Sequence, residues 1–118
     1  DSKILELYIR SQEMFNFIDK KYHLKDYYTS QQLDPIQRLY TKSLLPLYRA
    51  NQLNFLKKYN QNLIVIYDAP SGTLKLTFIH ADPKKAQEIL QSIIKHAEDV
   101  INKFAKENAK VALKFIEQ

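Results

Sequence analysis

An α+β fold is what the sequence predicts: an antiparallel β-hairpin (about residues 62–68 and 73–80) packed with N-terminal helices and followed by one long C-terminal helix (about 83–118). Three observations lead to this prediction. Residues 63–67 form a β-branched run, and residues 73–79 alternate between apolar and polar side chains. Elsewhere, apolar residues recur at the three- and four-residue spacings of amphipathic helices.

Helices are expected before the hairpin. A first helix is predicted over about residues 2–21, with Ser2 as its N-cap and an apolar stripe along one face. Residues 22–33 lack periodicity and end in polar side chains, which favours a loop. A short helix is predicted over about 34–42, where an aspartate cap precedes a proline at the first helical position, and Pro46 begins another.

The predicted hairpin turn contains the sole glycine of the chain. Its residues include Asp68, Pro70, Ser71 and Gly72. The glycine lies where such a turn needs a positive φ, which glycine adopts without steric cost. One face of the second strand would carry Leu74, Leu76 and Phe78. A two-stranded hairpin alone is marginally stable and leaves both edges open, so we expect a further strand, from outside this sequence or from another subunit, to complete the sheet.

The longest predicted helix begins with Asp82 as its cap and Pro83 at the first helical position. Four apolar residues at nearly heptad spacing form a candidate helix-packing seam: Ile93, Val100, Phe104 and Val111. At 1.5 Å per residue the helix would be roughly 50 Å long, which exceeds what so small a domain covers. We therefore expect its distal half to pack against another helix of a longer protein or against another subunit.

Composition excludes several classes of function. The chain is 45% apolar and 26% charged, values typical of a single globular domain, here residues 1–118. It has no cysteine, which excludes disulfides and thiolate metal sites, and a single glycine, which excludes glycine-rich phosphate loops. His23, His80 and His96 are scattered and lack the spacing of metal ligands. We predict no catalytic residue, no metal and no cofactor, and therefore a protein that is not an enzyme.

The net charge of +5 is spread along the chain, with zero over residues 1–40, +3 over 41–82 and +2 over 83–118. Only three of the eighteen basic residues are arginine, the side chain that base-reading interfaces favour. The segment Lys20–Tyr28 nevertheless interleaves lysines with tyrosines, whose rings can stack on nucleobases. A basic nucleic-acid-binding module that uses this segment is the alternative function, although we prefer to place these rings at the edge of the core.

Six short segments, in sequential order, carry a resemblance to a known family. They are Asp1–Leu5, Leu63–Asp68, Ser71–Gly72, Leu74–Phe78, Asp82–Ile89 and Asn108–Ala112. In these segments the chain resembles the periplasmic portion of the capsule polysaccharide export inner-membrane proteins. These are relatives of the O-antigen chain-length determinants, which are called polysaccharide co-polymerases.

The resemblance implies a location and a set of partners. Members of this family have a transmembrane helix near each end, a periplasmic α/β base near the membrane, and long helices that project outward. They are non-enzymatic homo-oligomers that link an ABC transporter to an outer-membrane polysaccharide export channel. The expected location is therefore the periplasmic side of a bacterial inner membrane, and contact with the polysaccharide itself stays open.

The two ends of the chain favour a piece of a longer protein. The sequence begins at Asp1 without an initiator methionine and stops at Gln118 inside a helical pattern. A coiled-coil adaptor of another pathway would share these physical features, so it remains a third interpretation of the sequence.

Overall fold

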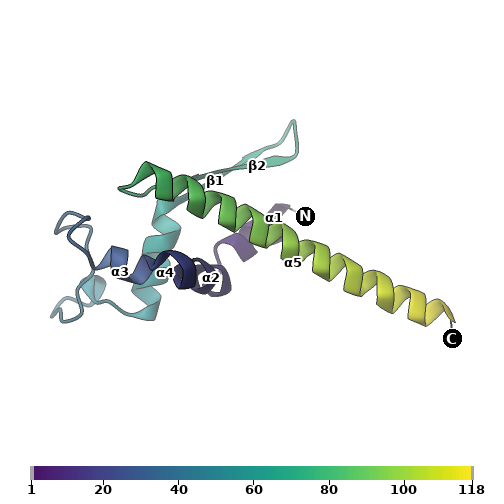
Figure 1. Ribbon diagram of the computed structural model, residues 1–118, viewed down its shortest axis with the longest axis horizontal. Helices are drawn as coiled ribbons and strands as arrows, with labels where there is room; N and C mark the ends of the chain where they lie inside the picture. The colour runs from purple at the N-terminus through teal and green to yellow at the C-terminus, as the bar shows by residue number, and fades with distance from the viewer. Residues whose placement is uncertain (1, 118) are drawn as a thin grey trace.

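The computed structural model describes the backbone of residues 2–117 and the side chains of residues 3–109. The predicted α+β class is confirmed: helices come first, a two-stranded antiparallel hairpin follows, and one long helix ends the chain (Figure 1). The elements are α1 Ser2–Ile9, α2 Gln12–Tyr22, α3 Leu24–Tyr28, the 3₁₀ helix η1 Pro46–Tyr48, α4 Gln52–Asn62, β1 Leu63–Asp68, β2 Thr73–Phe78 and α5 Pro83–Glu117.

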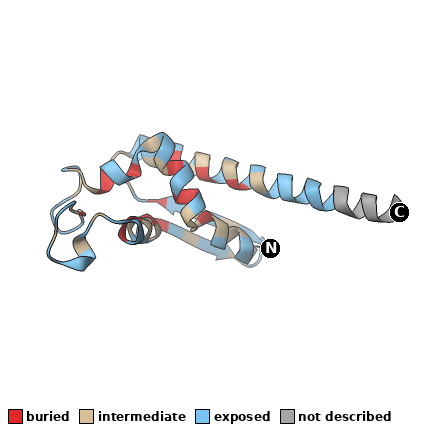
Figure 2. Ribbon diagram, turned by 90° about the horizontal axis from the view of Figure 1, so that it is seen from below, coloured by how far each residue is buried: buried red, intermediate tan, exposed pale blue. Residues whose placement is uncertain are grey.

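The core lies where α2, α4 and the first turns of α5 meet the base of the hairpin. Its largest fully buried side chains are Tyr28, Tyr59, Phe15, Ile9, Met14, Ile18, Leu24, Leu39, Leu63, Ile89 and Ile93. Buried residues occupy only the first part of α5, and the rest of its described length is exposed (Figure 2). One polar contact joins distant elements inside this core, because the Tyr59 hydroxyl donates to the Ile9 carbonyl oxygen at 2.7 Å.

The prediction of one helix over residues 2–21 is wrong, because the chain breaks into α1 and α2. Ser11 lies at the break, where its Oγ donates to the Tyr8 carbonyl oxygen (2.6 Å) and accepts from the Met14 backbone N–H (3.2 Å). A serine hydroxyl competes for backbone groups in this way and thereby caps the second helix. Next to the break, the Arg10 side chain donates to Asn60 Oδ1, and the Asn60 side-chain amide donates to the Arg10 carbonyl oxygen. These two hydrogen bonds join the break to α4.

The loop predicted over residues 22–33 is also partly wrong, because it contains α3. His23 has φ 55° and ψ 51°, and its backbone N–H donates to the Asp19 carbonyl oxygen at 2.8 Å. This left-handed residue ends α2 and lets the chain turn at once into α3, which buries Leu24, Tyr27 and Tyr28. The signal was missed because glycine or asparagine is the usual residue at such a position.

The helix predicted over about residues 34–42 does not form, and the helix predicted from Pro46 begins later, at Gln52 of α4. Asp34 Oδ1 does accept from the backbone N–H groups of the next turn, but the turn does not continue. Tyr40 instead forms a parallel bridge with Arg49, which takes it out of a helical path. Pro46 begins only the three residues of η1, and α4 has its own cap at Asn51, whose Oδ1 accepts from the Asn54 backbone N–H at 2.8 Å.

The hairpin prediction is confirmed, with β1 paired to β2 in the register Leu63↔Phe78 to Asp68↔Thr73. Gly72 has φ 68°, and nothing lies within 4 Å of the position its Cβ would take, so conformation rather than space calls for glycine. The inner face of β2 carries Leu74, Leu76 and Phe78. Phe78 is buried, and the two leucines nearer the turn are half-buried. Within the described residues the sheet has two strands, and it projects from the helices (Figure 1).

A compact corner connects the hairpin to α5. Asp82 Oδ1 accepts from the backbone N–H groups of Lys84 (3.0 Å) and Lys85 (3.4 Å), and the helix begins at Pro83. His80 Nδ1 accepts from the Asp82 backbone N–H at 3.0 Å, and its ring stacks on Tyr27 with centroids 3.8 Å apart. The neutral imidazole is therefore part of the corner that sets the direction of α5.

This corner predicts a pH dependence of folding stability. Burial, and then the positive charge of Lys85, lower the pKa of His80, so the unfolded chain binds a proton at a higher pH than the folded chain does. The free energy of unfolding should fall as the pH drops through the ordinary histidine value of about 6.5.

Chemical denaturation at a series of pH values measures the slope of the free energy of unfolding against pH. His80→Asn keeps a hydrogen-bond acceptor at this position but cannot take up a proton, so its stability should depend less on pH between about 7 and 5. Every other residue is the same in the two proteins, so the difference between their slopes reports on His80. An unchanged slope in the variant would exclude His80 as the cause.

Candidate functional site

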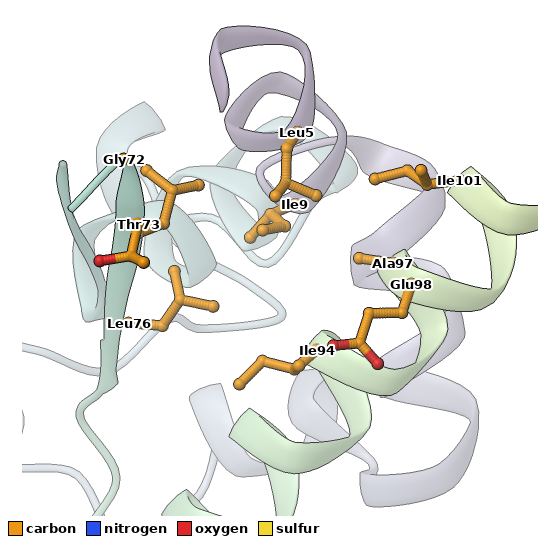
Figure 3. A pocket seen from close by; sticks show the side chains of 10 residues that line it. Leu5, Ile9, Gly72, Thr73, Leu76, Ile94, Ala97, Glu98 and Ile101 are labelled. Carbon is orange, nitrogen blue, oxygen red and sulfur yellow. The ribbon is translucent and has the colours of Figure 1, made fainter. Parts of the chain in front are cut away.

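An apolar cleft of about 440 Å³ lies between α1, β2 and α5. Figure 3 shows Leu5 and Ile9 of α1 and Leu76 of β2 directed into the same space as the side chains of α5. The lining residues are Leu5, Ile9, Gly72, Thr73, Leu74, Leu76, Ile94, Ala97, Glu98 and Ile101. Glu98 is the one charged side chain among them. A cleft with so few polar groups suits apolar packing rather than acid–base chemistry.

A second, smaller pocket of about 220 Å³ continues the cleft along α5. Its lining residues are Ile4, Leu5, Tyr8, Val100, Ile101 and Phe104. Because Leu5 and Ile101 line both pockets, the two form one surface, which we call the α1–α5 face. Ile4, Ile101 and Phe104 are exposed there, and Phe104 exposes 64% of its surface. Such a contiguous apolar area is typical of an interaction surface.

The structure divides the four residues of the predicted seam. Ile93 is fully buried in the core of the domain itself, and Val100 is half-buried beside α1. Phe104 is exposed, and the side chain of Val111 lies outside the described residues. The stripe of α5 thus packs into the domain at Ile93, and within the described residues no element covers it at Phe104.

The predicted turn residues close the tip of the hairpin and bring no chemical group into the cleft. The Gly72 backbone N–H donates to the Asp68 carbonyl oxygen at 2.8 Å. Ser71 Oγ makes a short hydrogen bond to the Asp68 carboxylate and lies 2.6 Å from Thr73 Oγ1. Pro70 is exposed, and only Gly72 and Thr73 reach the edge of the cleft.

His80 and His96 make ring and hydrogen-bond contacts inside the fold, whereas the side chain of His23 is exposed. His96 stacks on Phe17 with ring centroids 3.7 Å apart, and its Nε2 lies 3.2 Å from the Tyr8 hydroxyl. Burial, and then the charge of Glu13, raise the pKa of Tyr8. Within the part of the chain that the structure describes, no three His, Cys, Asp or Glu side chains are grouped as a metal site would require.

The nucleic-acid alternative gains no support from the Lys20–Tyr28 segment. Tyr27 and Tyr28 are buried in the core, so their rings cannot stack on nucleobases. The Tyr22 hydroxyl is 2.8 Å from Ser92 Oγ on α5. The tyrosines therefore fasten α2 and α3 to the rest of the domain.

Sequence reasoning missed a second exposed surface, around η1 and the start of α4. We call it the basic leucine surface, and its members are Ile36, Lys42, Leu44, Leu45, Leu47, Lys57 and Lys58. It was missed because a helix from Pro46 would have placed Leu47 on its apolar face, while Leu44 and Leu45 lie between the two predicted helices. The signal in the sequence is the complete absence of acidic residues between Asp34 and Asp68.

The division of the seam predicts that the same substitution has a large effect on folding stability at one position of α5 and a small effect at another. Ile93→Asp places a carboxylate in the core and should lower the free energy of unfolding by more than about 3 kcal/mol. Phe104→Asp alters an exposed side chain and should change it by less than about 0.5 kcal/mol. Urea denaturation of the isolated chain measures both. Similar losses at the two positions would mean that Phe104 belongs to the core.

No helix within the described residues is both long enough and apolar enough to cross a membrane, and no protein-family model matches the chain. Over 117 residues, which is 99% of its length, the chain is 26% identical to the capsule polysaccharide export inner-membrane protein KpsE of Escherichia coli. The chain spans 29% of the length of that protein. The comparison therefore identifies the chain as similar, at a distance, to part of an inner-membrane protein of capsule polysaccharide export.

Proposed function

We propose that the chain is a non-enzymatic assembly domain of an inner-membrane protein needed for capsule polysaccharide export, and that it lies on the periplasmic side. The observation that carries this proposal is the similarity to KpsE along 99% of the chain. The similar region includes both the hairpin and α5, so the relation concerns the whole domain rather than one helix.

The α1–α5 face supports the assembly part of the proposal. Ile101 and Phe104 continue the buried stripe of α5 past the core and are exposed there. At helical spacing, such residues fit the stripe of a second copy of the same helix, which would bury both. Ile64 and Ile66 on the outer face of the hairpin offer a further apolar strip to a neighbouring subunit. The occupant we propose for both is another copy of this protein.

The long helix supports the bridging part of the proposal. α5 has 35 residues, about 52 Å at 1.5 Å per residue, and it extends well past the core (Figure 1). A ring of such helices would lead away from the membrane-proximal base towards an outer-membrane export channel, while the base would lie near an ABC transporter. These two partners come from the family resemblance.

Phe104→Asp in the full-length protein tests assembly and export together. We expect loss of the oligomer by mass measurement, weaker recovery of the transporter and the channel in a pull-down, and reduced surface capsule. A charge in an apolar helix seam opposes association, whereas folding of the domain should persist. The matched control is Asn102→Asp, which adds the same charge to an exposed position of the same helix.

Two results would contradict the proposal in different ways. An unchanged oligomer mass in Phe104→Asp would remove the α1–α5 face from the assembly surface. Normal capsule export in cells that lack the whole gene would remove the export function itself.

A further inference from the structure

The net charge of residues 35–67 alone equals the net charge of the whole chain. Residues 35–67 contain five basic side chains and no acidic one, so the remainder, with thirteen of each, is neutral. The five are Arg38, Lys42, Arg49, Lys57 and Lys58. Such a segment attracts anionic partners and repels a second copy of itself.

Apolar side chains protrude from the same segment. Leu44, Leu45 and Leu47 expose 95%, 61% and 74% of their surface. Two of these leucines are linked to the cations through Ile36, which lines two hollows. It shares one of about 310 Å³ with Leu45, and one of about 370 Å³ with Leu47, Lys57 and Lys58. These loops lie at the end of the molecule opposite the C-terminal end of α5 (Figure 1).

The fold holds this apolar tip in place. Asn54 is buried, and its side-chain amide donates to the carbonyl oxygens of Pro46 (2.8 Å) and Arg49 (2.9 Å). The Tyr40 backbone N–H donates to the Tyr48 carbonyl oxygen at 2.7 Å, which closes the loop that carries the leucines. The leucines are thus exposed by a closed, hydrogen-bonded loop, and ordering that loop adds little to the cost of binding.

We propose that the basic leucine surface docks on the surface of a bilayer that contains anionic lipid. The leucines enter the boundary between headgroups and acyl chains, and Lys42, Lys57 and Lys58 face the lipid phosphates. A protein partner would need a deep apolar pocket for a leucine as exposed as Leu44, with acidic side chains around it for the lysines, whereas a fluid lipid layer accepts the leucine without a matching shape. This docking does not depend on the proposed export function, since it rests on charge and exposure alone.

Vesicle co-sedimentation of the 118-residue chain tests the docking. The vesicles are either phosphatidylcholine alone or about three parts phosphatidylcholine to one part phosphatidylglycerol, at about 0.05 M and about 0.5 M salt. We expect binding to the anionic vesicles that weakens at high salt, and little binding to the neutral ones. Lys57→Gln with Lys58→Gln should weaken binding about 25-fold, and Leu44→Ser with Leu45→Ser at least about tenfold.

The matched control is Lys103→Gln with Lys106→Gln, which removes the same charge from an exposed stretch of α5 and should change binding less than about threefold. An equal loss in this control, or equal binding to neutral vesicles, would overturn the proposal. So would a chain that stays in solution but forms a dimer that Leu44→Ser with Leu45→Ser abolishes, because the leucines would then face a second copy. Unchanged unfolding midpoints show that the variants are folded.

Discussion

The structure depends on the burial of one stripe of α5, at Ile89, Ile93 and Ala97, against the helices that precede the hairpin. These three side chains tie the last element of the chain to the first ones. Two residues of α2 also contact α5: the Tyr22 hydroxyl is hydrogen-bonded to Ser92 Oγ, and the Phe17 ring stacks on His96. Past Ala97 the same stripe continues, but α1 leaves Val100 half-buried and Phe104 exposed. The stripe that stabilises the domain therefore also produces its exposed apolar face.

The features predicted correctly from the sequence are those determined by neighbouring residues. Strand alternation with one glycine at a turn indicated the hairpin, and an aspartate–proline pair before a long apolar period indicated α5. The misses lie where a side chain redirects the backbone, as Ser11 and His23 do, or where a distant pairing overrides local propensity, as between Tyr40 and Arg49. The seam was predicted as one surface, but only tertiary packing could divide it between Ile93 and Phe104.

Two surfaces of different chemistry lie at separate places on this small domain. The α1–α5 face is apolar and has Glu98 as its one charged lining residue, which suits another helix of the same kind. The basic leucine surface combines leucines with lysines and has no acidic member, which suits an anionic layer. With both occupied as proposed, the base would rest on a membrane while α5 led away from it into an assembly. The distant similarity to KpsE is consistent with such a placement.

The central claim is that the apolar stripe of α5 packs into the core of the domain up to Ala97 and packs against a partner beyond it. Amide hydrogen exchange along α5, in the isolated chain and in the assembled full-length protein, tests this most directly. The account predicts slow exchange over residues 89–97 in both samples, and fast exchange over 100–109 in the isolated chain that becomes slow on assembly. Equal protection of residues 100–109 in the two samples would contradict it.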